Sequence, residues 1–98
     1  MAPTYITFKS CHGAYIRANG DGETMAQTKE NMDDLLNIDA WDKFEIIKHA
    51  DGMVTFKSCH GAYIRANGDG ETMAQTKENM DDIENIDAWD KYKVIYHF

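Results

Sequence analysis

Two short sequences place a thiol next to an imidazole, Cys11-His12 and Cys59-His60. Thiolate and imidazole are good zinc ligands, but a structural zinc site usually pairs its ligands at CxxC-like spacing, which this sequence lacks. Zinc would therefore need equivalent turns to converge in a ring of Cys or His. The alternative interpretation is a small buried thiol beside a turn histidine. We expect no metal and no other cofactor.

The segment Asn19–Glu23, NGDGE, resembles the opening of a calcium-binding loop. An EF-hand loop needs further oxygen ligands, a Glu at its twelfth position and two flanking helices. Glu30 is the twelfth residue counted from Asn19, but no flanking helix is predicted. The overlapping Asn-Gly and Asp-Gly dipeptides favour a tight hairpin turn instead.

Nucleophilic catalysis needs a Ser or Cys beside an oriented base. Neighbouring side chains on an extended chain point to opposite faces, which is expected to separate Cys11 from His12. The remaining histidines are His49 and the two copies, His60 and His97. No Ser–His–Asp order and no carboxylate pair stands out among the 17 acidic residues. We therefore predict that the protein is not an enzyme.

An internal repeat organises all of these residues. Residues 7–34 recur letter for letter as residues 55–82, an offset of 48. Asn37–Lys43 recurs as Asn85–Lys91, and the segments that follow diverge. The identity includes polar residues of the kind that usually vary freely on a surface. A recent duplication, an engineered symmetrical design, or a surface that presents the same site twice would each explain it.

Length and charge limit the possible architectures and partners. The chain has 98 residues, 43% of them hydrophobic, which suits a globular protein. Each repeat is near the lower size limit for independent folding. We therefore expect residues 1–50 and residues 51–98 to form two lobes of one structural unit. The net charge of −7 argues against nucleic acid and against an anionic membrane as partner.

The cysteines and the first residues bear on localisation. Cys11 and Cys59 are equivalent positions of the repeat, which favours free thiols and a reducing compartment. The first ten residues show no basic region followed by an apolar run, and no apolar stretch approaches the roughly 20 residues of a membrane span. We expect a soluble, cytoplasmic protein. Whether the thiols are reactive stays open.

Strand signals predict an all-β fold with four short strands in each repeat. In the first repeat these are residues 5–10, 14–18, 23–28 and 43–48. The turns Cys11–Gly13 and Asn19–Gly22 separate the first three, and a polar, irregular loop at residues 29–42 precedes the last. No segment has the sustained 3.6-residue period of a helix. We expect Tyr15, Trp41 and Phe44 to lie in the core, because aromatic side chains bury large areas.

Four-stranded units of this length occur as propeller blades and as lobes of β-trefoils. A WD-type blade would place Trp-Asp at the end of a strand, whereas Trp41-Asp42 precedes the last predicted strand. The pattern F-K-S-x-H-G-x-Y-I-x-A-x-G-D-G followed by A-W-D-K-F-x-I resembles β-trefoil domains of the fascin and hisactophilin type. The residues that carry this resemblance, each with a counterpart in the second repeat, are Phe8, His12, Gly13, Tyr15, Ile16, Trp41, Phe44 and Ile46.

The resemblance implies three lobes, and this chain has two. An incomplete barrel would expose strand edges and half a core. The smallest arrangement of whole chains and whole trefoils uses six lobes from three chains. We therefore predict a homotrimer of about 34 kDa, three times the 11.2 kDa chain. A closed assembly with another strand count stays open.

Repeated polar loops suggest non-catalytic, multivalent binding, with carbohydrate as the favoured ligand class. Sugars are bound by Asn, Asp and Gln hydrogen bonds together with a stacked aromatic ring, and repetition of weak sites adds avidity. We predict that the ligand-binding residues are Asn19, Asp21, Gln27, Asn31 and Asn37, with their equivalents Asn67, Asp69, Gln75, Asn79 and Asn85.

The family resemblance itself implies a different partner, because members of the fascin and hisactophilin family bind actin. Actin is acidic, so a net charge of −7 would oppose that contact. Four histidines are also too few for a hisactophilin-like pH switch. A third hypothesis is a duplicated or engineered scaffold without a natural ligand. A glycan array and a co-sedimentation assay with actin filaments would distinguish the three.

Overall fold

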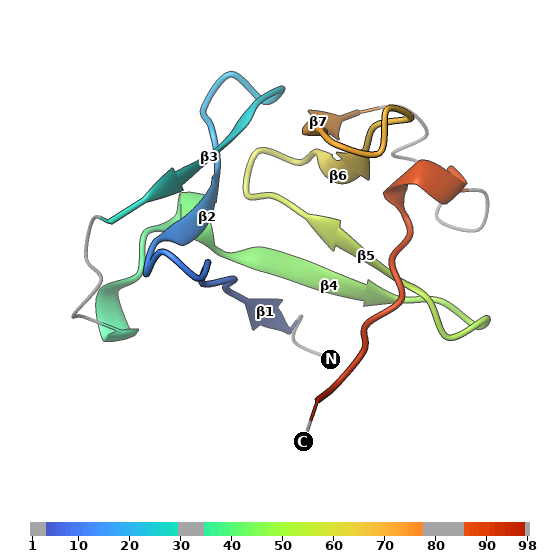
Figure 1. Cartoon of the computed structure of the whole chain (residues 1–98), viewed down its shortest axis with the longest axis horizontal. Coiled ribbons are helices and arrows are strands. Elements are labelled where there is room, and N and C mark those ends of the chain that lie inside the picture. Colours follow the sequence, from blue (N-terminus) through green and yellow to red (C-terminus); the bar gives the residue numbers. More distant parts are fainter. Residues whose placement is uncertain (1–3, 30–34, 78–85, 98) are drawn as a thin grey trace.

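The computed structural model describes residues 4–29, 35–77 and 86–97, and in these ranges it is an all-β fold without an α-helix (Figure 1). The first repeat contains β1 (Tyr5–Ile6), β2 (Tyr15–Ala18), β3 (Met25–Thr28) and β4 (Phe44–Lys48). The second contains β5 (Val54–Lys57), β6 (Tyr63–Ala66) and β7 (Met73–Thr76). Short 3₁₀ turns lie at η1 (Leu35–Asn37), η2 (Ala40–Asp42) and η4 (Ala88–Asp90). None of the helices described is long and apolar enough to cross a membrane.

One sheet joins the two repeats. Its strand order is β1-β4-β5-β6-β7, while β2 and β3 form a separate two-stranded sheet. The β4–β5 hairpin crosses from one repeat to the other, with Ile46 opposite Phe56 in antiparallel register. Its turn is closed by hydrogen bonds from the Gly52 N–H to the His49 carbonyl and from the His49 N–H to the Met53 carbonyl. Through this hairpin the two repeats share one sheet.

The predicted turn after β2 is confirmed in both repeats. Asp21 accepts hydrogen bonds from the backbone N–H groups of Glu23 and Thr24, each at 2.8 Å, and from the Thr24 hydroxyl at 2.7 Å. Gly22 has a φ of 71°, a conformation that side chains with a Cβ rarely adopt. The turn sets the register of the hairpin, with Ala18 opposite Met25.

Aromatic rings from both repeats form the core. The Phe8 ring lies 5.0 Å from Phe56 and 5.7 Å from Phe44, between centroids, and Phe56 lies 5.3 Å from Tyr92. Phe44 is fully buried and Tyr15 nearly so, which confirms two of the three predicted core aromatics.

The prediction that Trp41 lies in the core is wrong. Its side chain is 38% exposed, and its equivalent Trp89 is 50% exposed. The indole packs over Gly20, where an added Cβ would come within 2.5 Å of it. Glycine is therefore needed at this position for the close approach of the ring, which covers the edge of the hairpin and does not enter the core.

Two strand predictions also need correction. The predicted strand at residues 5–10 is interrupted: β1 ends at Ile6, and Lys9 forms only an isolated bridge to Tyr15. The expected fourth strand of the second repeat is reduced, in the described residues, to a single bridge between Tyr92 and Val54. Its counterpart β4 has strand neighbours on both sides, β1 and β5, whereas among the described strands the shortened segment has no second neighbour.

Candidate functional site

Both repeats bury an ion pair in the same place. The Arg17 guanidinium donates to the carboxylate of Asp42 at 2.9 and 3.4 Å, and Arg65 donates to Asp90 at 2.8 and 3.3 Å. Both carboxylates are fully buried. A buried carboxylate needs such a two-pronged partner, because desolvation without one is costly. This pair therefore holds the second strand of each repeat against its 3₁₀ turn.

The loop residues predicted to bind a ligand make hydrogen bonds inside their own turns. Asn19 Nδ2 donates to the Thr24 hydroxyl at 2.9 Å, and Asn67 repeats this bond with Thr72. Hydrogen bonds from the Thr72 side chain, and then from the Thr72 and Glu71 backbone, lower the pKa of Asp69 to about 2. The equivalent bonds from Thr24 and Glu23 lower the pKa of Asp21.

Gln75 lies at the contact between the repeats, where it lines a pocket of about 310 Å³ together with Asp21, another residue predicted to bind a ligand. It is 6% exposed, its Nε2 donates to the carbonyl groups of Asn19 and Thr24 at 3.1 and 2.9 Å, and its Oε1 accepts from Ser58 at 2.8 Å. Its equivalent Gln27 is exposed. Identical residues thus have different surroundings in the two repeats.

The remaining predicted binding residues do not add a shared site. Asn37 is exposed at the end of η1. Asn31, Asn79 and Asn85 lie outside the described residues. The described members of the predicted set are therefore distributed between hairpin turns, one 3₁₀ turn and the contact between the repeats, and two of them, Asp21 and Gln75, line the same pocket.

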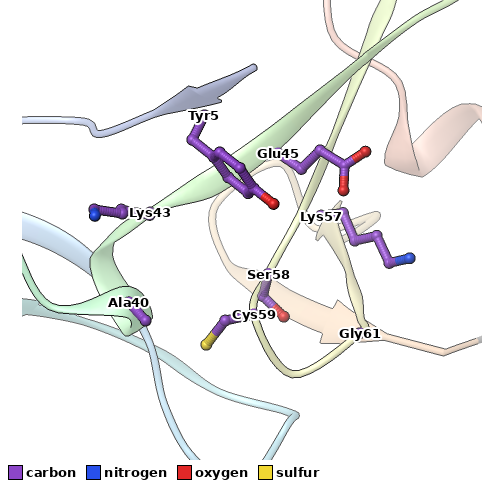
Figure 2. A pocket seen from close by; sticks show the side chains of 8 residues that line it. All are labelled: Tyr5, Ala40, Lys43, Glu45, Lys57, Ser58, Cys59 and Gly61. Carbon is purple, nitrogen blue, oxygen red and sulfur yellow. The ribbon is translucent and has the colours of Figure 1, made fainter. Parts of the chain in front are cut away.

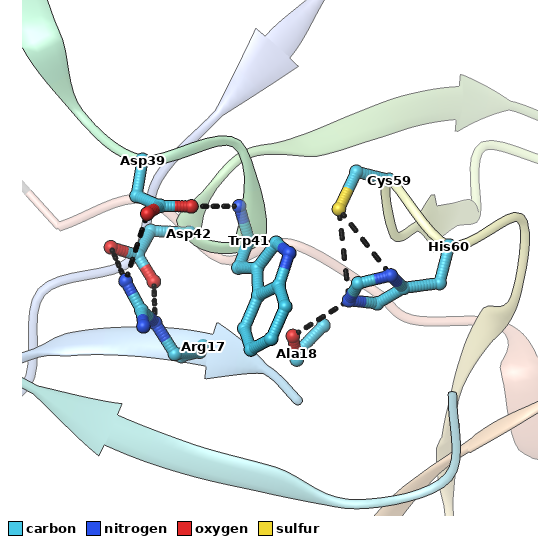
Figure 3. A network of polar contacts seen from close by, with 7 residues as sticks. All are labelled: Arg17, Ala18, Asp39, Trp41, Asp42, Cys59 and His60. Atoms are coloured by element: carbon cyan, nitrogen blue, oxygen red, sulfur yellow. Dashed lines mark hydrogen bonds and ion pairs between the residues drawn. The ribbon is translucent and has the colours of Figure 1, made fainter. Parts of the chain in front are cut away.

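The contact between the repeats also contains a network of polar and aromatic side chains, which Figure 3 shows. His60 Nε2 donates to the Ala18 carbonyl at 3.0 Å. The Trp41 indole lies between two neighbours, with its centroid 5.1 Å from the His60 ring and 5.4 Å from the Arg17 guanidinium carbon. Such contacts stabilise the junction between the repeats.

Cysteine and histidine neighbours lie closer than the sequence predicted. Cys11 Sγ is 3.5 Å from His12 Nε2, and Cys59 Sγ is 3.7 Å from His60 Nε2. They sit in a turn and not on an extended strand, so the expected separation to opposite faces is wrong. Burial, with the nearby carboxylates of Asp39 and Asp42, raises the pKa of the Cys59 thiol.

Both thiols are free, and the described residues contain no group of three His, Cys, Asp or Glu side chains placed to hold a metal ion. The predicted alternative of a Cys or His ring is thus not formed within the part of the chain that the structure describes.

A pocket of about 560 Å³ opens beside the junction of the repeats, and Figure 2 shows its lining. Tyr5, Glu45 and Lys57 form a row across β1, β4 and β5, since Tyr5 is opposite Glu45 and Glu45 is opposite Lys57. Lys43 lies at one side, and the turn at Ser58–Gly61 lies at the other. The Tyr5 ring extends from β1 toward this space and is 58% exposed.

The pocket contains polar groups that the fold itself does not use. Within residues 4–29, 35–77 and 86–97, the side chains of Tyr5, Lys43, Glu45 and Lys57 make no hydrogen bond or ion pair. An exposed aromatic ring bordered by donors and acceptors is a common composition of ligand sites, and in Figure 2 the ammonium groups of Lys43 and Lys57 point to opposite sides of the pocket.

Sequence reasoning missed this pocket because it searched the repeated residues. Tyr5 and Glu45 are not repeated: Met53 and Lys93 stand at the equivalent positions. A comparison of where the two repeats differ, together with strand pairing across their boundary, is the signal that could have found it.

No curated protein matches the sequence. A family of β-trefoil domains, described as of unknown function, has a model that matches residues 2–91, almost the whole length. This match agrees with the all-β architecture and with the β-trefoil resemblance of the repeated pattern. The chain therefore belongs to this family, the β-trefoil domain of unknown function DUF569.

Proposed function

We propose that this β-trefoil chain is a non-catalytic binding protein and that its ligand is a carbohydrate. The observation that carries the proposal is the pocket at the junction of the repeats, where Tyr5 is surrounded by polar side chains that the fold leaves unused. A tyrosine ring offers an apolar face to a sugar ring, and Glu45 accepts hydrogen bonds from hydroxyl groups. Lys43 and Lys57 donate to hydroxyl or carboxylate oxygens.

Two features support binding in preference to catalysis. Nucleophilic attack requires a thiolate, and the raised pKa of Cys59 favours the protonated thiol at neutral pH. The pocket holds one carboxylate and two ammonium groups, and its hydroxyl group from Ser58 donates to Gln75. The base beside Cys59 is His60, and Nε2 of this ring is engaged by the Ala18 carbonyl at 3.0 Å.

The experiment is a glycan array followed by calorimetric titration of the best ligand with matched variants. Tyr5→Met introduces the residue that the second repeat carries at the equivalent position, and Glu45→Gln removes the carboxylate without placing a second ammonium group opposite Lys57. Each is expected to weaken binding by about tenfold, the loss of roughly 1.4 kcal/mol. Ile6→Val is the control, because Val54 is its equivalent and Ile6 does not line the pocket.

Absence of any glycan signal, or equal affinity of Tyr5→Met and Ile6→Val, would contradict the proposal. Co-sedimentation with actin filaments is run on the same protein. Sedimentation with actin in the absence of glycan binding would replace carbohydrate by the partner that the fascin and hisactophilin resemblance implies. Failure in both assays would favour a scaffold without a natural ligand.

A further inference from the structure

Another cavity, of about 320 Å³, lies in the core and is lined only by apolar surface. The first repeat contributes Phe8, Ile16, Met25 and Phe44, and the second contributes the residues 48 positions later. Every lining residue therefore belongs to an equivalent pair. A trefoil builds its core from three lobes, so these pairs are two thirds of a three-fold set. An unfilled apolar space lacks the packing contacts of a closed core.

The contact seen between the repeats has two different faces. We call the side of the first repeat that meets the second its trailing face, which includes Ala18, Asn19 and Trp41. The side of the second repeat that meets it is the leading face, which includes Ser58, His60 and Gln75. Hydrogen bonds from His60 to Ala18 and from Gln75 to Asn19 join them, and Ala18 is fully buried.

The same two faces recur unused. The leading face of the first repeat carries Ser10, His12 and Gln27. These are the same residue types that the leading face of the second repeat uses in its contact with the first repeat. His12 and Gln27 are exposed. The trailing face of the second repeat includes Ala66 and Trp89, both exposed. The molecule thus has an open position flanked by one leading and one trailing face of known complementarity.

Strand edges in the part of the chain that the structure describes also lack a second neighbour: β1 is paired on one side, with β4. In the described residues the segment after Tyr92 forms no strand, and Val94 and Ile95 are 41% and 67% exposed. Their equivalents, Ile46 and Ile47, are paired with Phe56 and Thr55 of β5. An incoming first strand of the same kind would pair with the segment after Tyr92.

We propose that the open position is a docking site for one repeat from another copy of this chain. The occupant is identified by its sequence: it must carry both a leading and a trailing face, and each repeat of this chain does. Three chains hold six repeats, which fill two complete trefoils. One chain of the three opens at the His49–Met53 turn and gives one repeat to each trefoil.

Association is favourable because it adds contacts between leading and trailing faces. Three separate chains contain three contacts between leading and trailing faces, whereas two closed trefoils contain six. This net gain of three comes from four contacts that form and one that is lost when the chain opens. The trailing faces of the three second repeats, and therefore Ala66, are engaged only in the closed trefoils. In each of the two trefoils, the third repeat also fills the apolar cavity of about 320 Å³ in the core. Both changes bury apolar surface, which offsets the entropy lost on association.

The test is the solution mass of the full chain by light scattering at several concentrations. Wild-type protein is expected at three times 11.2 kDa. Ala66→Arg places a charge in the trailing face of each second repeat and is expected at the mass of one chain. Leu36→Arg places the same charge at a side chain that is 93% exposed and belongs to neither face nor to the turn that opens, and it is expected to match wild type.

A wild-type mass of one or two chains at every concentration would overturn the proposal, and so would a three-chain mass for Ala66→Arg. Circular dichroism checks that Ala66→Arg is folded. If it is not, Gln27→Ala provides the reading, because Gln27 is exposed in the single chain. It is expected to raise the dissociation constant of the assembly by at least about tenfold, and an unchanged constant would overturn the proposal. These outcomes are independent of glycan binding.

Discussion

The two repeats share 28 consecutive residues, yet at two of the described positions the residue is buried in one repeat and exposed in the other. Ala18 is fully buried while Ala66 is exposed, and Gln75 is buried while Gln27 is exposed. By contrast, the pairs Arg17–Asp42 and Arg65–Asp90 have nearly the same geometry. Contacts within a repeat are therefore set by its own sequence, and contacts at its edges are set by whether another repeat lies beside it.

The largest effects are expected from the contacts within each repeat. Asp42→Ala and Asp90→Ala each leave an arginine without its buried partner, which costs about 3–5 kcal/mol. Because the pairs are geometrically alike, the two losses should agree within about 1 kcal/mol. Denaturant unfolding of both variants gives the values. A loss of stability at only one of the two positions would contradict the claim that contacts within a repeat do not depend on its neighbour.

Next come the two equivalent glutamines. Gln75→Ala removes three side-chain hydrogen bonds at a buried site and is expected to cost about 1–3 kcal/mol. Gln27→Ala removes an exposed side chain, with a change within about 0.5 kcal/mol. Both are measured by denaturant unfolding in an Ala66→Arg background, which blocks the proposed assembly. Equal losses of stability would show that the contribution of this glutamine does not depend on whether another repeat lies beside it.

A smaller difference in stability loss is expected between alanine substitutions of the two glycines that lie under the indoles. An added Cβ at Gly20 would lie 2.5 Å from Trp41, and one at Gly68 would lie 2.8 Å from Trp89. Trp41 is held by His60 of the other repeat, and Trp89 is more exposed and can move outward. Gly20→Ala is expected to cost about 1–2 kcal/mol and Gly68→Ala less than about 1 kcal/mol. Thermal unfolding distinguishes them, and a larger loss for Gly68→Ala would contradict the account.

The smallest effect concerns the turn carboxylates. The pKa of Asp69 is about 2 in the folded chain, below the ordinary value of 3.8. A lowered pKa stabilises the fold at pH above 3.8, and this contribution is lost as the pH falls toward 2. Thr72→Val removes the main hydrogen bond and should raise the pKa toward its ordinary value. Carboxyl NMR titration measures it, and an unchanged pKa in Thr72→Val would show that the hydroxyl is not the cause.

Much of the fold could be predicted because its signals are local. The Asn-Gly and Asp-Gly dipeptides fixed the hairpin turns, and strand propensity placed Tyr15 and Phe44 in the core. Trp41 was misplaced because its burial depends on the missing side chain at Gly20, which lets the ring lie flat over the turn. A propensity scale records that Trp is large and apolar, not that a glycine lies beneath it.

The candidate site was harder to predict because it depends on long-range pairing. Tyr5 and Glu45 are 40 positions apart and meet only through the register of β1 with β4. The burial of Gln75 could not be predicted, because its sequence context is identical to that of the exposed Gln27. An exact repeat cannot reveal which copy lies beside a neighbour, since that information is in the assembled structure alone.

The most direct measurement compares the methyl groups of Ala18 and Ala66 by NMR, using a soluble paramagnetic agent that broadens exposed signals. In dilute protein Ala66 is expected to broaden strongly while Ala18 stays sharp, because only Ala18 is buried in the single chain. On raising the concentration, Ala66 is expected to become as protected as Ala18, since a third repeat then covers it. An Ala66 signal that stays accessible at all concentrations, or an Ala18 signal as accessible as Ala66, would contradict the account.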